Sequence, residues 1–251
     1  MARKAAVVTG SDSGIGRAIA IALARDGFDV GITWHSDEEG ARETARLCEE
    51  HDVRTVVRQL DASDLPDAAR IVDAFAEELG RLDAFVNNAG MGEEAPFLEM
   101  TFEQWRKMLA TNLDGPFVLA QRAAQIMVKQ GDGGRIVNVT SVHEFTPIDK
   151  QAHYTASKHG LGGLTKNMAM ELASHGILVN SVAPGMIATP MNDMEAEDAF
   201  RDEQPDIPLK RAGTPDEIAG LVAWLCGPAA TYATGKSYIV DGGLTLNMKT
   251  Q

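Results

Sequence analysis

Cysteine and positive charge are both scarce in this chain of 251 residues. Its two cysteines, Cys48 and Cys226, stand far apart and next to no Cys or His at metal-ligand spacing. This scarcity excludes a disulfide framework and a cysteine-based metal centre. We expect two free thiols, no bound metal and a reducing compartment.

Basic residues are outnumbered, since 23 Lys and Arg stand against 36 Asp and Glu, a formal net charge of −13. A nucleic-acid-binding protein needs a basic patch for phosphates, and the sequence offers no obvious one. The same charge disfavours adsorption to an anionic membrane surface. We therefore predict a small-molecule substrate, and neither nucleic acid nor a membrane as a partner.

Long apolar runs are also missing. No stretch approaches the ~20 apolar residues that a membrane-spanning helix needs. The first apolar run, residues 5–8, is too short for the core of a signal peptide, and it reads as a strand. We expect a cytoplasmic protein.

The sequence does contain a series of short apolar runs that read as strands. They are mostly continuous rather than alternating, which is typical of a parallel sheet covered by helices on both faces. The predicted strands are residues 5–8, 30–34, 54–57, 84–86, 136–139, 177–182 and 238–240.

Helical patterns separate these runs. Apolar residues recur at helical spacing after Gly14, and Thr214 with Pro215 and two acids makes a good helix start. The alternation predicts an α/β fold over residues 1–251: a single-domain, doubly wound parallel sheet of Rossmann type. Residues 189–212 interrupt this alternation of strands and helices, and they contain three prolines and many acids. We predict a substrate loop or lid there, with a plain surface excursion as the alternative.

A glycine-rich turn links the first strand to the first helix. Glycines let the backbone turn sharply and approach a ligand, and the following helix N-terminus favours a pyrophosphate. The spacing is Gly-x-x-x-Gly-x-Gly, which differs from the usual dinucleotide fingerprint, and a simple tight turn is the alternative. The cofactor-binding residues predicted here are Gly10, Ser13, Gly14, Ile15 and Gly16.

Polar and small residues follow two further strands. Asp61 and Ala62 come after the third, and Asn88, Ala89 and Gly90 come after the fourth. Ligands of open α/β sheets lie across the carboxyl ends of the strands, so these residues suit an adenosine site. Taken singly, each could instead be a helix cap or a turn.

Tyr154 and Lys158 are one helical turn apart on a predicted helix, so their side chains are neighbours. A free tyrosine has a pKa near 10, and lowering it by about 3 units requires roughly 4 kcal/mol. One positive charge about 4 Å away, at an effective dielectric constant near 20, supplies energy of that order. The pairing therefore predicts a general acid/base, Tyr154, activated by Lys158.

Two more residues complete the predicted catalytic group. Ser141 follows the fifth strand and could hydrogen-bond the substrate oxygen, and Asn112 in an earlier helix could anchor a water that reaches Lys158. Taken singly, a Tyr and Lys at this spacing are usually surface residues, and a Ser at a strand end is usually a cap.

Together these motifs resemble the short-chain dehydrogenase/reductase family over essentially the whole chain. The matching pieces are Thr9-Gly-x-x-x-Gly-x-Gly16, Asp61, Asn87-Asn-Ala-Gly90, Asn112, Ser141, Tyr154-x-x-x-Lys158, Pro184-Gly185-x-Ile187-x-Thr189 and Asp241-Gly242-Gly243. The resemblance implies a catalytic tetrad of Asn112, Ser141, Tyr154 and Lys158. It also implies that Lys158 contacts the nicotinamide ribose and that Ile187 and Thr189 hold the carboxamide. Tyr154, Pro184 and Gly185 are further residues expected to bind the cofactor. A homotetramer, with the strand around Ile239 at an interface, is the expected assembly.

The adenosine 2′ position is read just after the second strand, by an acid for NAD or a basic residue for NADP. The family's NAD-selecting acid would fall at Trp34, which cannot play that role, and His35 is weakly basic. The missing acid favours NADP, with NAD as the alternative if the strand ends later and Asp37 takes the place.

The predicted substrate pocket includes His143, Phe145, Met186 and Met191. This modestly apolar set suits a small neutral ketone, diketone or polyol, as in the family's acetoin/diacetyl reductase-like and glucose dehydrogenase-like members. Reduction of a 3-oxoacyl thioester on acyl carrier protein is the alternative, which the net charge and Met170 disfavour. A remote alternative is a cofactor-binding sensor without turnover.

Overall fold

The computed structural model describes residues 3–247. Seven parallel strands form one sheet in the order β3-β2-β1-β4-β5-β6-β7. They are β1 (Ala5–Val8), β2 (Asp29–Trp34), β3 (Thr55–Gln59), β4 (Ala84–Asn87), β5 (Gly134–Val139), β6 (Ile177–Pro184) and β7 (Ser237–Val240). Each predicted run is a strand, and the doubly wound Rossmann-type sheet is confirmed.

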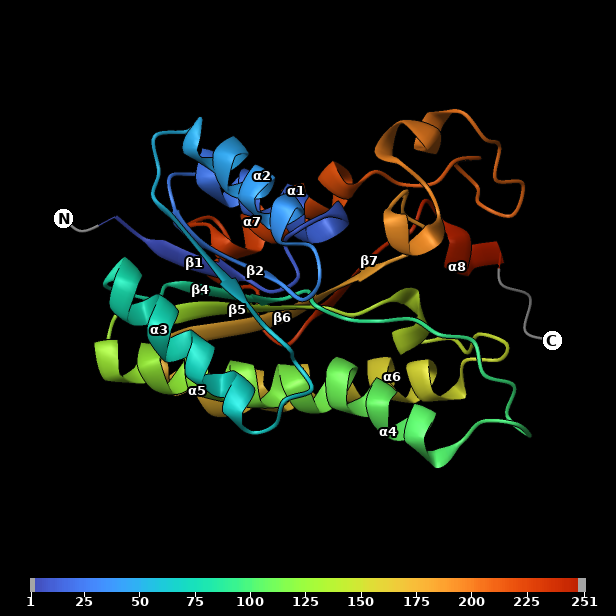
Figure 1. Ribbon diagram of the computed structural model, residues 1–251, viewed down its shortest axis with the longest axis horizontal. Helices are drawn as coiled ribbons and strands as arrows, with labels where there is room; N and C mark the ends of the chain where they lie inside the picture. The colour runs from blue at the N-terminus through green and yellow to red at the C-terminus, as the bar shows by residue number, and fades with distance from the viewer. Residues whose placement is uncertain (1–2, 248–251) are drawn as a thin grey trace.

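Helices cover both faces of the sheet (Figure 1). On one face lie α1 (Gly14–Arg25), α2 (Glu38–Glu49) and α7 (Pro215–Cys226). On the other lie α3 (Arg70–Leu79), α4 (Phe102–Leu109), α5 (Gly115–Gln130) and α6 (Ala152–Leu172). The short α8 (Leu244–Asn247) follows β7. As predicted, Thr214 caps α7, and its hydroxyl accepts a hydrogen bond from the backbone N–H of Glu217.

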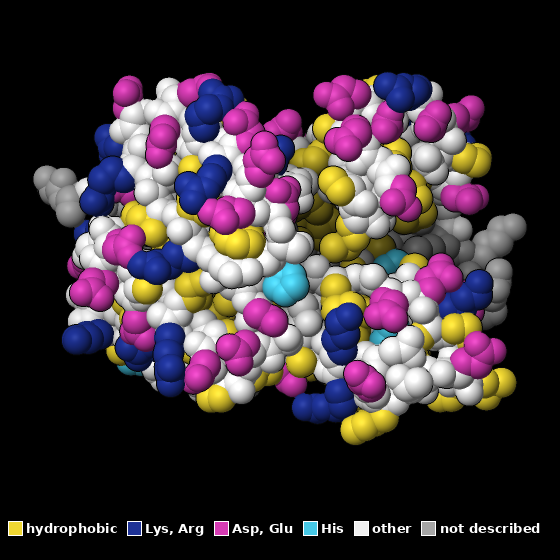
Figure 2. All heavy atoms as spheres, viewed as in Figure 1, with side chains coloured by type: hydrophobic (Ala, Val, Ile, Leu, Met, Phe, Trp, Pro, Cys, Tyr) yellow, Lys and Arg dark blue, Asp and Glu magenta, His cyan; other side chains and the backbone are white. Residues whose placement is uncertain are grey.

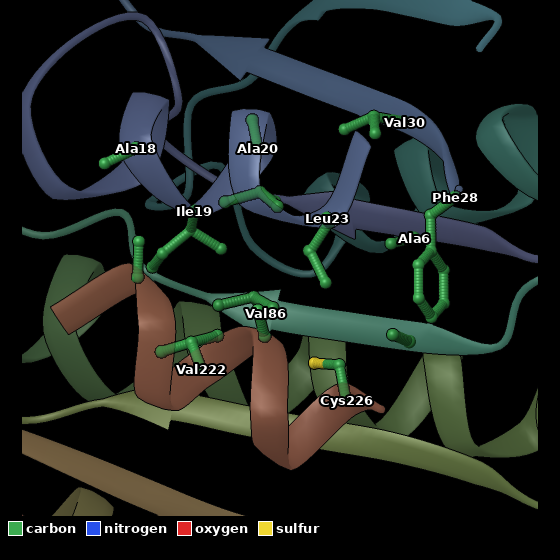
Figure 3. Close-up of a cluster of buried hydrophobic side chains, with 14 of the residues drawn as sticks. Ala6, Ala18, Ile19, Ala20, Leu23, Phe28, Val30, Val86, Val222 and Cys226 are labelled. Atoms are coloured by element: carbon green, nitrogen blue, oxygen red, sulfur yellow. The ribbon is translucent and has the colours of Figure 1, made fainter. Parts of the chain in front are cut away.

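The hydrophobic core has one layer on each face of the sheet. In the layer shown in Figure 3, Ile19 and Leu23 of α1 pack with Val222 and Cys226 of α7 over Val86 of β4. All four residues of β1 are buried, because both faces of this central strand are covered. This double burial explains why the strand runs are continuously apolar.

The order of the strands brings the sequence motifs to one edge of the sheet. The chain winds outward from β1 through β2 to β3, then returns to β4 on the other side of β1. The backbone N–H of Thr9, after β1, donates to the carbonyl of Val86 in β4 at 3.0 Å. The glycine turn therefore stands at the topological switch point, where open α/β sheets bind ligands.

Residues 189–212 have more structure than a plain loop. They contain two short 3₁₀ turns, η5 (Pro190–Asn192) and η6 (Ala196–Phe200). A small buried cluster of Ala188, Ala199 and Ala212 holds the segment together. In Figure 1 the segment stands apart from α1 and α2, and Figure 2 shows a hollow with hydrophobic side chains between the two parts.

Both cysteine thiols are free and buried. In the part of the chain that the structure describes, no helix is long and apolar enough to cross a membrane.

Candidate active site

The glycine turn is tied to the end of β4 by paired hydrogen bonds. Gly10 has a φ of +60°, which glycine adopts without strain. The side-chain amide of Asn88 donates to the carbonyls of Thr9 and Gly10, at 3.0 and 2.8 Å. The Thr9 hydroxyl in turn accepts from the backbone N–H groups of Asn88 and Ala89, both at 3.0 Å. The two predicted cofactor segments thus form one rigid unit.

The N-terminus of α1 fits an anionic group. Ser13 is the N-cap residue, but its side chain makes no capping hydrogen bond, and the first turn holds no acid. The leading N–H groups and the positive end of the helix are therefore available to a phosphate. A Cβ at Gly16 would lie 2.0 Å from the Gly10 carbonyl oxygen, so only glycine allows this close turn. Ile15 packs on the core beneath it.

His35 and Asp61 come together at the ends of β2 and β3. The His35 Nε2 lies 3.9 Å from an Asp61 carboxylate oxygen. Hydrogen bonds from the hydroxyl and backbone N–H of Ser63 lower the pKa of Asp61, so its carboxylate stays charged. Ala62 beside it is buried. Trp34 is half-buried and packs against the core. His35, the next residue, is a basic side chain that is exposed at the end of β2.

Asp12 and Asp37 add negative charge near the same turn. Asp37 is the N-cap of α2, and its carboxylate accepts from the backbone N–H of Gly40 at 2.9 Å. Burial raises the pKa of Asp12, and the nearby Asp37 charge raises it further. The Arg17 guanidinium binds the carbonyls of Asp12 and Gly40 beside this pair.

Tyr154 and Lys158 lie on the first turns of α6, as predicted. The Lys158 Nζ is 5.5 Å from the centre of the Tyr154 ring. Lys158 is only 5% exposed, and its Nζ donates to the carbonyl of Val139 at 3.2 Å. That bond fixes the ammonium against the end of β5, below the phenol. Burial lowers the pKa of Lys158 to about 8, although the negative charge of Glu144 raises it.

Ser141 begins the short turn η3 (Val142–Glu144) directly after β5. Its Oγ accepts a hydrogen bond from the backbone N–H of His143 at 3.2 Å. A hydroxyl that accepts one hydrogen bond keeps its own proton for another partner. Burial raises the pKa of Tyr154, the opposite direction to the lowering expected from Lys158, and a hydrogen bond with Ser141 partly offsets that effect. The phenol is therefore protonated at neutral pH and stands ready to donate.

Asn112 lies in a π-helical turn, Ala110–Asp114, that joins α4 to α5, rather than in a regular helix. Such turns often occur at functional sites. Its side chain binds Met91 through both backbone groups, at 2.8 and 2.9 Å. A Cβ at Gly90 would lie 3.2 Å from the Asn112 Oδ1 and 3.7 Å from the Lys158 Nζ. Asn112 and Lys158, two of the predicted catalytic residues, thus meet beside Gly90.

The segment after β6 runs toward the glycine turn. A Cβ at Gly185, next to Pro184, would lie 2.7 Å from the Asp241 Cβ, which explains the glycine. Ile187 is buried and pairs with Gly213. A Cβ at Gly14 would lie 3.3 Å from the Thr189 methyl group, so this segment borders the N-terminus of α1.

The four predicted pocket residues differ in their relation to the catalytic group. The half-buried His143 ring meets the Tyr154 ring edge to face, with centroids 6.1 Å apart. Its Nδ1 bonds the carbonyl of Thr146 at 3.2 Å. Phe145, directly after η3, and Met186 and Met191, after β6, are exposed apolar side chains.

Two buried residues beside the tetrad had not been singled out from the sequence. The backbone N–H of Tyr154 donates to the Nδ1 of His153 at 2.9 Å, which satisfies a donor at the start of α6. Glu144 is buried and accepts hydrogen bonds from Thr140 and Ser237. A spacing rule could not find Glu144, because Ser237 is 93 residues away along the chain.

Comparison with known proteins identifies the family. The family model described as enoyl-(acyl carrier protein) reductase matches residues 9–245. An uncharacterised oxidoreductase of Escherichia coli (strain K12), YohF, is 56% identical over 96% of this chain and 95% of its own. The chain is a short-chain dehydrogenase/reductase. It is accordingly an oxidoreductase that transfers a hydride between a nicotinamide cofactor and an alcohol/carbonyl pair.

Other members of this family are similar over nearly their whole length. Glucose 1-dehydrogenase 2 of Bacillus subtilis (strain 168) is 38% identical over 97% of this chain and 95% of its own. The crystal structure of acetoin dehydrogenase YohF from Salmonella typhimurium is 54% identical, with a TM-score of 0.95 and coverages of 99% and 98%. A carveol dehydrogenase from Mycobacterium avium was solved in complex with NAD (31% identity, TM-score 0.88, coverages of 97% and 98%).

Proposed function

We propose that this short-chain dehydrogenase/reductase interconverts a small α-hydroxy ketone or diol with the corresponding carbonyl compound. The observation that carries the proposal is the arrangement of Ser141, Tyr154 and Lys158 beside the glycine turn. The neighbour solved as an acetoin dehydrogenase supports the substrate class. The exposed apolar side chains of Phe145, Met186 and Met191 suit a small neutral molecule better than an anion.

The cofactor would bind along the carboxyl edge of the sheet. The pyrophosphate fits the N-terminus of α1, and adenosine fits the ends of β2, β3 and β4. The residues proposed to hold it are Gly10, Ser13, Gly14, Ile15, Gly16, Trp34, His35, Asp61, Ala62, Asn88, Ala89, Gly90, Tyr154, Lys158, Pro184, Gly185, Ile187 and Thr189. When bound, the nicotinamide supplies or accepts the hydride.

The proton would move through Tyr154. In reduction, the Ser141 hydroxyl and the Tyr154 phenol hold the carbonyl oxygen, and Tyr154 donates its proton as negative charge develops there. The Lys158 ammonium then stabilises the phenolate that remains. Asn112 holds the Met91 backbone and can anchor a water on the path from Lys158 to solvent. In oxidation the same proton returns to Tyr154.

Cofactor choice depends on the groups around the adenosine ribose. Trp34 supplies no acid, and the exposed His35 can accept a 2′-phosphate, which favours NADP. The Asp12 and Asp37 pair opposes a phosphate dianion nearby. We propose NADP as the preferred cofactor with NAD as a working substitute, a preference of less than about tenfold, or about 1.4 kcal/mol.

The segment of residues 189–212 is proposed to close over the substrate. Its short turns carry Met191 and Phe200 as exposed apolar side chains, and it borders the hollow in Figure 2. Closure would exclude water from the reacting carbonyl.

We also propose a cytoplasmic homotetramer. Ile239 on the edge strand β7 is 44% exposed, and Trp224 on α7 is 43% exposed. Phe117 on α5 and Met170 on α6 are exposed on the other face of the sheet. Two separate sets of uncovered apolar side chains match the two kinds of contact that a tetramer with dihedral symmetry needs. Light scattering after size exclusion would measure the mass directly.

A single plate of assays tests the proposal. NADPH and NADH oxidation is followed at 340 nm with acetoin, diacetyl, simple ketones and aldoses, and with one acetoacetyl thioester. Turnover of acetoin or diacetyl well above that of the other compounds supports the proposed substrate class. Preference for the thioester would replace it with acyl-chain reduction, and binding of both cofactors without any turnover would favour a sensor.

A further inference from the structure

Glu144 carries a buried carboxylate to which the proposed chemistry assigns no role. It is 5% exposed and ends the turn that begins at Ser141. Its Oε2 accepts hydrogen bonds from the hydroxyls of Thr140 (2.8 Å) and Ser237 (2.7 Å). Two hydroxyl donors on one oxygen are the partners that an ionised carboxylate takes. A carboxylate in such a place destabilises the fold unless a nearby positive charge compensates it.

The second oxygen of Glu144 lies against α6. This Oε1 is buried and has no hydrogen-bond partner within the described residues. A Cβ at Gly162 would lie 2.2 Å from it, so the helix makes room for the carboxylate by having glycine there. Gly162 is four residues after Lys158, which places the two on the same face of α6. The carboxylate therefore packs one turn beyond Lys158.

Lys158 is a buried positive charge on the same face of α6 as Gly162, against which Glu144 packs. Its ammonium is buried, and the residues within four positions of it on α6 include no acid. The hydrogen bond from its Nζ goes to a neutral acceptor, the Val139 carbonyl. Burial favours the uncharged amine, and Glu144 is the group whose charge opposes this effect, raising the pKa of Lys158. Glu144 therefore supplies the negative charge that opposes the loss of the Lys158 proton.

A chain of hydroxyl groups connects Glu144 to the edge strand β7 and its neighbour β6. Ser237 on β7 donates to Glu144, so Ser181 on β6 is the donor in the 2.7 Å bond between the two serines. The carboxylate is thus fixed from two strands as well as from its own turn, and it cannot swing away from α6 without breaking these bonds.

We propose that Glu144 is a positioning residue for the reaction, the counter-charge that keeps the Lys158 ammonium protonated beside Tyr154. The inference rests on the proposed function, in which a charged Lys158 makes Tyr154 an acid/base. Glu144 touches neither the substrate nor the cofactor in this account. It acts through Lys158, so it should change the pH at which the enzyme works.

The test is the pH profile of kcat for acetoin or alcohol oxidation in Glu144→Gln. The amide keeps the shape and can accept the two hydroxyl hydrogen bonds, but it removes the charge. Lys158 then loses its proton at lower pH, so the Tyr154 phenolate loses its positive neighbour. The rising limb of the pH profile of kcat therefore moves to higher pH. Removal of one unit charge beside Lys158 predicts that this limb shifts by about one pH unit.

Two variants separate charge from packing. Glu144→Asp restores the charge and is expected to keep the limb near its wild-type position. Ser181→Ala is the matched control, because it removes a hydroxyl from the same chain and leaves both hydrogen bonds to Glu144 in place. Its profile is expected to overlay that of the wild type. Thermal melting of each variant verifies that it is folded.

An unshifted profile in a folded Glu144→Gln overturns the proposal and leaves Glu144 with a structural role alone. If that variant does not fold, Glu144→Ser replaces it. This change also removes the charge, so a shift in the same direction is expected, and no shift overturns the proposal. Tyr154→Phe serves as the reference. If this variant remains active, the proposed function itself fails. If Tyr154→Phe is inactive and the pH profile of Glu144→Gln is unshifted, only this inference is refuted.

Discussion

The ammonium of Lys158 lies 5.5 Å from the centre of the Tyr154 ring, one helical turn further along α6. Both groups are held in place from outside the helix. Val139 accepts a hydrogen bond from the ammonium, and Ser141 stands at the phenol. This is the proposed acid/base pair, and it lies on one helix at the edge of the sheet where the predicted cofactor segments meet.

Lys158→Met tests the burial of that ammonium through the pH dependence of stability. Burial in the folded protein lowers the pKa of Lys158 to about 8, below its ordinary value of 10.5. Between these values the unfolded chain binds more protons, so the folded state gains stability as the pH rises. Relative to Lys158→Met, the wild-type free energy of unfolding should increase by up to about 3 kcal/mol from pH 8 to 10.5.

Urea unfolding at several pH values measures this difference. The exposed Lys166 on the same helix provides the control, because Lys166→Met removes a lysine that is already in water. A constant difference between wild type and Lys158→Met across that range would show that the ammonium is not held in a low-dielectric site.

Gly162→Ala tests the packing of the Glu144 carboxylate against α6. The added methyl group would meet the Oε1 at 2.2 Å and displace it. We expect the free energy of unfolding to fall by about 1–3 kcal/mol. The neighbouring Gly163 is exposed and has open space for a Cβ. Gly163→Ala should therefore stabilise the helix by about 0.5–1 kcal/mol. Equal effects of the two changes on thermal melting would contradict this packing.

His35→Arg tests the proposed site of the adenosine 2′-phosphate. A guanidinium there can form a charge-assisted hydrogen bond, so kcat/KM for NADPH should rise by about tenfold relative to NADH. His35→Gln adds no charge and should not raise the preference for NADPH. An equal change for both cofactors in His35→Arg would place the 2′ position elsewhere, and Asp37 would then be the next residue to change.

The arrangement of strands and helices could be predicted because its signals are local. Each strand is buried on both faces and reads as an apolar run, and the cap at Thr214 lies within four residues of sequence. The boundaries were less exact: the run predicted over residues 54–57 is β3, Thr55–Gln59, which begins one residue later and ends two residues later. Residues 189–212 appeared irregular from their prolines, yet they form short turns around buried alanines.

The part of the site that could be predicted consists of residues that belong to short sequence motifs. The structure brings Asn112, Ser141, Tyr154 and Lys158 together, and their catalytic roles stay predictions. What the sequence could not reveal depends on contacts between distant segments. The bond between Glu144 and Ser237 joins η3 to β7, and the π-helical turn at Asn112 has no residue pattern that marks it.

The central claim is that Tyr154 is the proton donor and acceptor of the reaction, and Tyr154→Phe tests it most directly. The variant keeps the ring and its packing, so melting temperature and the Kd of the cofactor should stay near wild-type values. With the best substrate of the panel, kcat should fall by about 10²- to 10⁴-fold, the usual contribution of a general acid. A variant that keeps more than about a tenth of the wild-type kcat would contradict the account.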